Sequence, residues 1–122
     1  MTAKPTVRVL RGAARIDPLS LADWGPIPPL PGADATSRTR GVLLHKGPDG
    51  SPETGIWECT PGEWACRVER DEFCCFLEGR STYTDASGEQ TSIGPGDIAF
   101  FPAGWIGTCR VIETVRKVYM IR

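Results

Sequence analysis

The residues of this 122-residue chain with the clearest chemical potential are a carboxylate and neighbouring thiols. Glu72 and Cys74 are two positions apart, so on a β-strand their side chains would share one face. A carboxylate beside a thiol could act as a general acid or base, bind zinc, or activate the sulfur as a nucleophile. Cysteine is also a small hydrophobic residue that is common in cores, so simple packing is the competing interpretation.

Two further candidates, Lys117 and Tyr119, share a face near the end of the chain. If that face is inward, Lys117 would form an ion pair with Glu72, and the pKa values of both groups would shift. We therefore take Glu72, Lys117 and Tyr119 as candidate catalytic residues. An outward lysine whose stem lies along the sheet is the alternative.

Composition restricts the classes of partner and the compartment. The chain has 14 basic and 15 acidic residues, so we expect no nucleic-acid partner and no attraction to anionic lipid. No apolar run approaches the roughly 20 residues that span a bilayer, so we expect no membrane partner. The N-terminus lacks the apolar segment of a secretory signal, which favours a cytoplasmic protein with its five cysteines reduced.

The segments that must position these residues are predicted to be short strands separated by Gly/Pro turns. This pattern predicts one all-β domain, a barrel or sandwich. The segment 98–101 lies between two turn clusters and is expected to be a short buried strand. The other predicted strands are 40–45, 55–60, 63–69, 72–77, 81–84, 90–93, 108–113 and 115–121.

Residues 1–37 are predicted to form an extended N-terminal arm, and residues 38–122 the barrel. Residues 7–10 could form a short strand, and 17–24 could hold a helical turn. Asp17 would cap that turn, with Pro18 in its first position. The proline-rich segment that follows cannot form a helix or a central strand, so it must run extended over a surface. It could cover its own barrel or exchange with a second subunit.

The spacing of glycine and proline in the second half of the chain resembles the cupin superfamily. Gly96, Pro102 and Gly104 match the pattern Gly-x5-Pro-x-Gly in full, and Glu72 and Gly79 fit a first motif whose middle is degraded. Within that superfamily the chain is similar to the cupin half of ureidoglycine aminohydrolase and, more distantly, to the ethanolamine-utilisation cupin. The resemblance implies an antiparallel jelly-roll barrel of roughly six to eight strands that commonly forms homodimers.

The resemblance also implies where a metal would bind, and the chain departs from the family there. Two histidine ligands would fall at Cys66 and Val68 and a third at Gly107, which leaves only Glu72. One carboxylate is not a transition-metal site, so we expect no cofactor; a divalent metal, if bound, would use Glu72 and Cys66. The single histidine, His45, lies outside both motifs and is interpreted as an edge-strand or loop residue.

The barrel interior is the expected pocket. Aromatic walls with a few polar groups suit a small ligand. Arg67 and Glu69 are further polar candidates. By motif spacing and strand parity, the expected pocket residues are Trp64, Cys66, Val68, Cys74, Tyr83, Trp105, Gly107 and Cys109.

Three functions are compatible with these observations. The first, which we favour because the histidines are missing, is a small-molecule-binding cupin of unknown substrate. The second is a lyase, isomerase or hydrolase acting on a small metabolite, similar to ureidoglycine aminohydrolase, with Glu72 assisted by a thiol, lysine or tyrosine. The third is a structural component of a dimeric assembly, suggested by the apolar arm and an outward face that carries Phe73 and Cys75.

Overall fold

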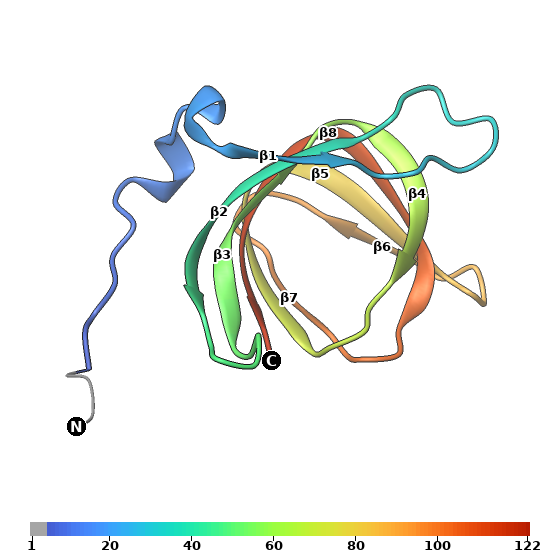
Figure 1. Cartoon of the computed structure of the whole chain (residues 1–122). Helices are drawn as coiled ribbons and strands as arrows, with labels where there is room; N and C mark the ends of the chain where they lie inside the picture. The colour runs from blue at the N-terminus through green and yellow to red at the C-terminus, as the bar shows by residue number, and fades with distance from the viewer. Residues whose placement is uncertain (1–4) are drawn as a thin grey trace.

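The computed structural model describes residues 5–122 and consists of antiparallel strands curled into a barrel (Figure 1). No α-helix occurs among these residues, and two short 3-10 helices, η1 (Ala13–Arg15) and η2 (Pro18–Ser20), precede the strands. The all-β prediction is therefore confirmed. The strands are β1 (Ala22–Pro26), β2 (Arg38–Lys46), β3 (Glu53–Cys59), β4 (Gly62–Arg67), β5 (Glu72–Asp85), β6 (Gln90–Ile93), β7 (Ile98–Phe101) and β8 (Ile106–Ile121).

Strand β8 is the centre of the sheet. One of its edges pairs with β5 along nearly its whole length, and the other pairs first with β4 and then with β3. The sheet order is β1-β2-β3-β8-β5-β6, with β4 attached to β8 and β7 to β5. Because successive side chains of a β-strand point to opposite faces of the sheet, alternate residues of β8 point into the barrel.

The packed core lies inside the barrel. Cys74, Phe76 and Cys109 are completely enclosed, with exposures of at most 1%. This packing fills only part of the interior, because other inward residues line an open cavity. The remaining core residues are Cys59, Trp64, Val68, Tyr83, Ile93, Phe101, Val111, Val115 and Tyr119.

Two strand predictions ended too early. The predicted strand 72–77 continues to Asp85, because Gly79 adopts a positive φ of 86° inside a bulged stretch of β5 rather than ending it. A Cβ at Gly79 would overlap the carbonyl oxygen of Thr114, so only glycine fits. The two predicted strands 108–113 and 115–121 are likewise one continuous strand, β8.

The bounds of β7 match the predicted strand 98–101, but the prediction that it is buried was wrong. Ile98 and Phe100 point outward and are 67% and 60% exposed, and Phe101 alone is buried. The turn before the strand is closed by a hydrogen bond in which the Gly94 N–H donates to the Asp97 carboxylate at 2.8 Å.

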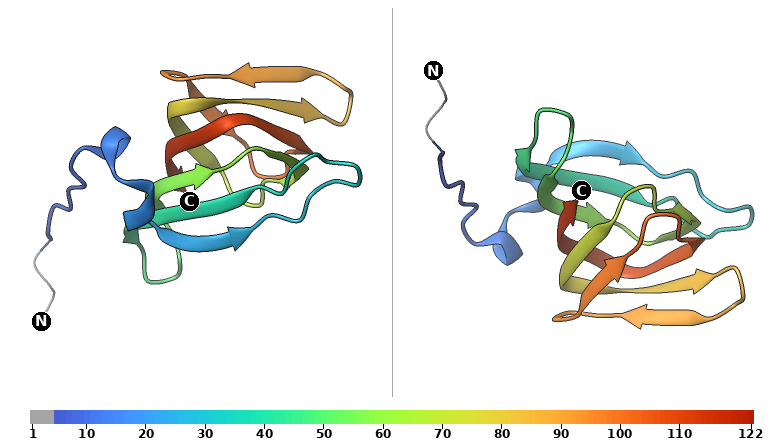
Figure 2. Two further views of the ribbon diagram at one scale, coloured as in Figure 1. Left: turned by 90° about the horizontal axis from the view of Figure 1, so that it is seen from above. Right: turned by 90° about the horizontal axis from the view of Figure 1, so that it is seen from below.

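The N-terminal arm lies to one side of the barrel and then joins it (Figure 2). Residues 7–10 form no strand, contrary to the prediction. The helical turn is confirmed: Asp17 caps η2 by accepting the Leu19 N–H at 2.9 Å, and Pro18 opens it. Strand β1 then pairs with β2 at the sheet edge, and it begins inside the stretch 17–24 that was expected to hold the turn. Its last two residues, Gly25 and Pro26, agree with an extended segment that cannot be central. Neither described helix is long and apolar enough to cross a membrane.

Candidate functional site

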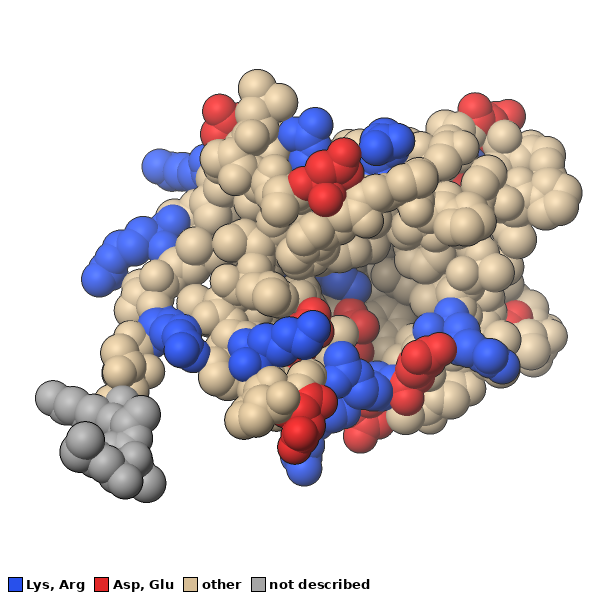
Figure 3. Space-filling model, viewed as in Figure 1, with Lys and Arg blue, Asp and Glu red and all other residues tan. Residues whose placement is uncertain are grey.

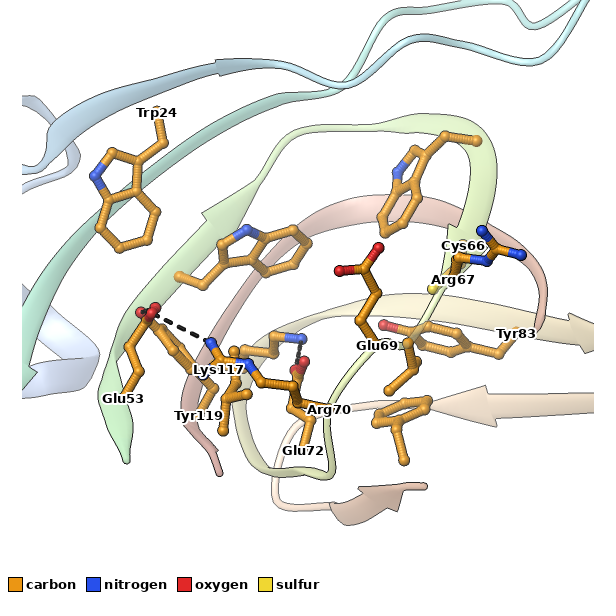
Figure 4. A pocket seen from close by; sticks show the side chains of 15 residues that line it. Trp24, Glu53, Cys66, Arg67, Glu69, Arg70, Glu72, Tyr83, Lys117 and Tyr119 are labelled. Carbon is orange, nitrogen blue, oxygen red and sulfur yellow. Dashed lines mark hydrogen bonds and ion pairs between the residues drawn. The ribbon is translucent and has the colours of Figure 1, made fainter. Parts of the chain in front are cut away.

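A cavity of about 450 Å³ opens at one end of the barrel. Figure 3 shows the hollow, with basic and acidic side chains at its rim, and Figure 4 shows the side chains that line it. The lining comes from strands that are far apart in the sequence, which the long pairing of β8 brings together. Its aromatic members are Trp24, Trp57, Trp64, Tyr83, Phe101 and Tyr119, and its charged members are Glu53, Arg67, Glu69, Arg70, Glu72 and Lys117.

Aromatic rings form much of the cavity wall. Trp57 and Trp64 meet edge to face with their ring centroids 6.4 Å apart, and the rings of Tyr83 and Phe101 lie 4.8 Å apart. Trp24 reaches the cavity from β1, so the arm contributes to the site. Such walls favour a ligand with a flat or apolar face.

The cavity floor holds a nearly buried ion pair. The Lys117 ammonium donates to Glu72 Oε2 at 2.7 Å, and the two side chains are 10% and 20% exposed. The Cys74 thiol donates to the same oxygen at 3.0 Å. The ammonium also lies 4.5 Å from the centroid of the Trp57 ring, a cation–π distance. The face of β8 that carries Lys117 is therefore inward, as one of our two interpretations required.

Both members of this pair are charged. Burial alone would raise the pKa of Glu72, but the Lys117 ammonium and the hydrogen bonds from Cys74 and Lys117 outweigh it, and the net shift is downward. Burial likewise opposes the charge on Lys117, yet the Glu72 carboxylate leaves its pKa raised. Glu72 is thus a weak base at neutral pH, and Lys117 is a fixed cation.

Tyr119 lines the cavity, and its partner there is Glu53 rather than Glu72. Its hydroxyl donates to Glu53 Oε2 at 2.8 Å, and the other oxygen of Glu53 faces Arg70 at 3.7 Å. Burial, followed by the bond to Glu53, raises the pKa of Tyr119. The hydroxyl therefore stays neutral and positions Glu53. Glu53 and Trp57 are four residues apart on β3, so the alternation of side chains along a strand puts both on the face that lines the cavity. This alternation was the signal in the sequence that could have identified Glu53.

The thiols differ in depth. Cys66 lines the cavity, whereas Cys74 and Cys109 are fully buried and do not. Burial is the main reason that the pKa of Cys66 rises to about 11 and those of Cys74 and Cys109 to about 12. Protonated thiols are poor nucleophiles and poor metal ligands, so packing describes the two buried cysteines better.

Some predicted pocket residues line the cavity and others do not. Trp64, Cys66, Val68 and Tyr83 line it together with the three candidate catalytic residues, as do Arg67 and Glu69. Trp105, another expected pocket residue, does not line the cavity and packs edge to face against the rings of Tyr83 and Phe101. Cys74, Gly107 and Cys109 also lie outside the lining. The sequence analysis missed Trp24, Glu53, Trp57, Arg70, Phe101 and Ile121.

The residues at the family's metal-ligand positions do not fit a metal ion. Val68 offers no donor atom, and a Cβ at Gly107 would overlap the carbonyl oxygen of Thr84. Glu72 already binds an ammonium. Within residues 5–122 no three His, Cys, Asp or Glu side chains are arranged to hold a metal. His45 lies on β2, outside the cavity, and its ring contacts the guanidinium of Arg8.

Comparison with known proteins agrees with the fold. Residues 46–119 match the family model described as the EutQ-like cupin domain. A Pseudomonas syringae protein of unknown function from the DUF861 family superposes with a TM-score of 0.72 at 24% identity, over 87% of this chain and 46% of that one. The chain thus spans about half the length of that relative. No curated protein matched the chain.

Two other solved structures extend the comparison. Ethanolamine utilization protein Q of Salmonella typhimurium has a TM-score of 0.60 at 24% identity, over 69% of this chain and 68% of that one. A DUF861 family protein of Thermotoga maritima has a TM-score of 0.54 at 34% identity, over 55% and 76%. The matches support the cupin fold and the resemblance to the ethanolamine-utilisation cupin, the more distant of the two resemblances in the sequence, and they give no support to ureidoglycine aminohydrolase. Because the family model covers more than half of the chain, the protein belongs to the family of EutQ-like cupin domains.

Proposed function

We propose that the protein binds a small molecule in the barrel cavity. The observation that carries this proposal is the unused hydrogen-bonding capacity of the ion pair on the cavity floor. An ammonium has three N–H donors, and Lys117 directs one at Glu72 Oε2. Within residues 5–122, Glu72 Oε1 accepts no hydrogen bond. A donor and an acceptor are therefore both available at the floor of a cavity whose wall is largely aromatic.

The charges of the lining restrict the ligand. Three carboxylates are balanced by three cations, so no net field favours an anion or a cation. A ligand with a net charge would lose hydration without compensation. The cavity volume of about 450 Å³ falls in the range of small-molecule sites. We infer a neutral or zwitterionic metabolite with a flat face and neighbouring donor and acceptor groups.

Binding is tested by screening neutral, zwitterionic, anionic and cationic metabolites against the wild-type protein by thermal shift, followed by calorimetry. Hits from the first two classes should bind at least about tenfold more weakly to Lys117→Met, a loss of about 1.4 kcal/mol. Glu113→Gln, on an exposed part of β8, is the matched control and should leave affinity unchanged. Equal affinity of Lys117→Met and wild type would show that the cavity floor is not the site.

Catalysis on a small metabolite, by a lyase, isomerase or hydrolase similar to ureidoglycine aminohydrolase, is the second candidate. Glu72 faces the cavity with one oxygen unbonded, which favours it, but its lowered pKa and the protonated Cys66 make weak catalysts. The test is turnover of any ligand found by the screen. Loss of turnover with retained binding in Glu72→Gln would raise this candidate above simple binding.

A structural role as a homodimer is the third candidate, and an exposed apolar face supports it. Phe73 lies between Phe100 of β7 and Met120 of β8, and all three are between 46% and 60% exposed. Ile98 extends this patch. Patches of this kind often mark contacts with another protein. Light scattering should then give a dimer that Phe73→Glu dissociates, and a monomeric wild type would contradict it.

A further inference from the structure

We propose that the ligand of the barrel cavity is an amino acid, whose ammonium group contacts Glu69 and whose carboxylate contacts Arg67. This inference rests on the binding function proposed above and narrows it to one class of zwitterion. Both residues line the cavity, and neither belongs to the ion pair on its floor.

Four of the six charged residues that line the cavity are already paired with one another. Lys117 contacts Glu72 at the floor, and Arg70 lies 3.7 Å from Glu53. Glu53 also accepts a hydrogen bond from the Tyr119 hydroxyl. These four charges therefore have protein partners before a ligand arrives.

The other two charges of the lining are Arg67 and Glu69. Within residues 5–122, neither side chain makes a hydrogen bond or an ion pair. In Figure 4 the two side chains do not point toward each other, and Glu69 is directed over the cavity. Both are exposed, whereas the floor pair is nearly buried, so they lie at the cavity opening. The opening thus carries one cation and one carboxylate that are free to contact a ligand.

The backbone between these two residues is fixed. Strand β4 ends at Arg67, and Glu69 lies in the loop that follows. Val68, between them, donates its N–H to the Trp105 carbonyl at 2.9 Å and accepts the Gly104 N–H at 2.8 Å. The Val68 side chain is buried and lines the cavity. One charge is therefore presented on each side of an apolar contact surface.

An amino acid carries the complementary pair of charges. Its carboxylate can accept two N–H groups of the Arg67 guanidinium, and its ammonium can donate to the Glu69 carboxylate. Because both residues adjoin Val68, their partners must also lie close together, as they do on the α-carbon of an amino acid. A ligand with only one of these groups would leave the other protein charge without a partner. The side chain of the amino acid would extend toward the donor and acceptor at the cavity floor.

The experiment screens the standard amino acids against the full chain by calorimetry at neutral pH, beside the metabolites named above. Each amino acid that binds is compared with two analogues that keep its side chain: the amine that lacks the carboxylate, and the acid that lacks the ammonium. We expect at least one amino acid to bind with a Kd below about 1 mM, and both of its analogues to bind at least about fivefold more weakly.

Two variants assign each charged group of the ligand to its partner. Glu69→Gln should weaken the amino acid at least about fivefold but should not weaken the acid that lacks the ammonium. Arg67→Gln should weaken the amino acid to a similar extent but should not weaken the amine that lacks the carboxylate. Arg110→Gln and Glu89→Gln are matched controls, because they remove exposed charges outside the cavity, and should leave affinity unchanged.

Three results would overturn the proposal: no amino acid binds, an amino acid binds both variants as tightly as wild type, or a variant weakens the amino acid and both analogues equally. Failure of the binding function itself gives a different result. If a neutral metabolite binds and loses affinity in Lys117→Met, the cavity is a binding site and only the amino-acid class is wrong. If no compound of any class binds, both proposals fail.

Discussion

Two glutamate ion pairs lie back to back on neighbouring residues of β8. Lys117 points into the barrel and pairs with Glu72, whereas Arg116 points to the outer face and pairs with Glu58 at 2.8 Å. The outer pair is the more buried, with side chains 3% and 9% exposed, against 10% and 20% for the inner pair. The same strand thus carries two ionic contacts with opposite orientations.

The two pairs differ in how completely their polar atoms are used. Arg116 donates twice to Glu58 Oε2 and donates its remaining terminal nitrogen to the Ala13 carbonyl of the arm. A cavity of about 590 Å³ also borders this pair, so the presence of a cavity does not distinguish them. In each pair only one carboxylate oxygen accepts a hydrogen bond within residues 5–122, so the difference lies in the cation. All three nitrogens of Arg116 donate hydrogen bonds, one of them to the arm, whereas the Lys117 ammonium donates to Glu72 alone. The outer pair therefore anchors the arm, and the inner pair is the one on which the binding proposal rests.

The largest expected effect comes from breaking the outer pair. Arg116→Met leaves the Glu58 carboxylate buried without a partner, which should lower the free energy of unfolding by about 3–5 kcal/mol. Urea unfolding followed by circular dichroism measures the loss. Replacing both partners, in Arg116→Met/Glu58→Leu, should recover most of it. A small loss in the single variant would show that the outer pair is not structural.

Breaking the inner pair should cost less. In Lys117→Met, water in the cavity can hydrate the freed Glu72 carboxylate, so we expect a loss of about 1–3 kcal/mol in the same urea experiment. Equal losses in Lys117→Met and Arg116→Met would remove the distinction between an anchoring pair and an available pair.

Strand parity grouped Glu72 with Cys74 and Lys117 with Tyr119, but it left open whether the face of Lys117 is inward. The inner pair was therefore one of two alternatives, and the outer pair was not predicted at all. Parity gives the face of a residue but not its depth along the barrel, so Cys74 and Cys109 were placed in the pocket although they lie in the packed core. The partner of Arg116 depends on the register between β3 and β8, which is a non-local property.

Other misses have equally physical causes. The position of Gly107 agrees with a ligand position of the family motif, but only the pairing of β8 with β5 shows that the Thr84 carbonyl leaves no space there. Trp24 reaches the cavity because β1 joins the sheet edge, which a proline-rich segment does not reveal. The turns and strands, by contrast, follow from local Gly/Pro chemistry, and this is why the barrel could be predicted.

Conservative exchanges of the two cations test the same comparison through smaller losses of unfolding free energy, of about 1 kcal/mol. Arg116→Lys removes the second bond to Glu58 and the contact with Ala13, which should cost about 1–2 kcal/mol. Lys117→Arg places a guanidinium where a cavity can accommodate it, and should cost less than about 1 kcal/mol.

Arg116→Lys should also speed tryptic cleavage at the exposed Arg11 and Arg15, because the arm loses an anchor. An unchanged cleavage rate would mean that the arm is held by other contacts.

The smallest expected effect is the pH dependence of the inner pair. The pKa of Glu72 in the folded protein is below its ordinary value of 4.5, so its contribution to stability is present above pH 4.5 and is lost as the pH falls through the folded value. The pKa of Lys117 is above its ordinary value of 10.5, so its contribution is present below pH 10.5 and is lost as the pH rises through the folded value. The difference in unfolding free energy between wild type and Lys117→Met should therefore be flat between these limits and shrink outside them. Urea unfolding at about pH 3, 7 and 11 measures it. A difference that persists at acidic pH would show that the ionised Glu72 carboxylate is not what Lys117 stabilises, and would leave packing against Trp57 as its contribution.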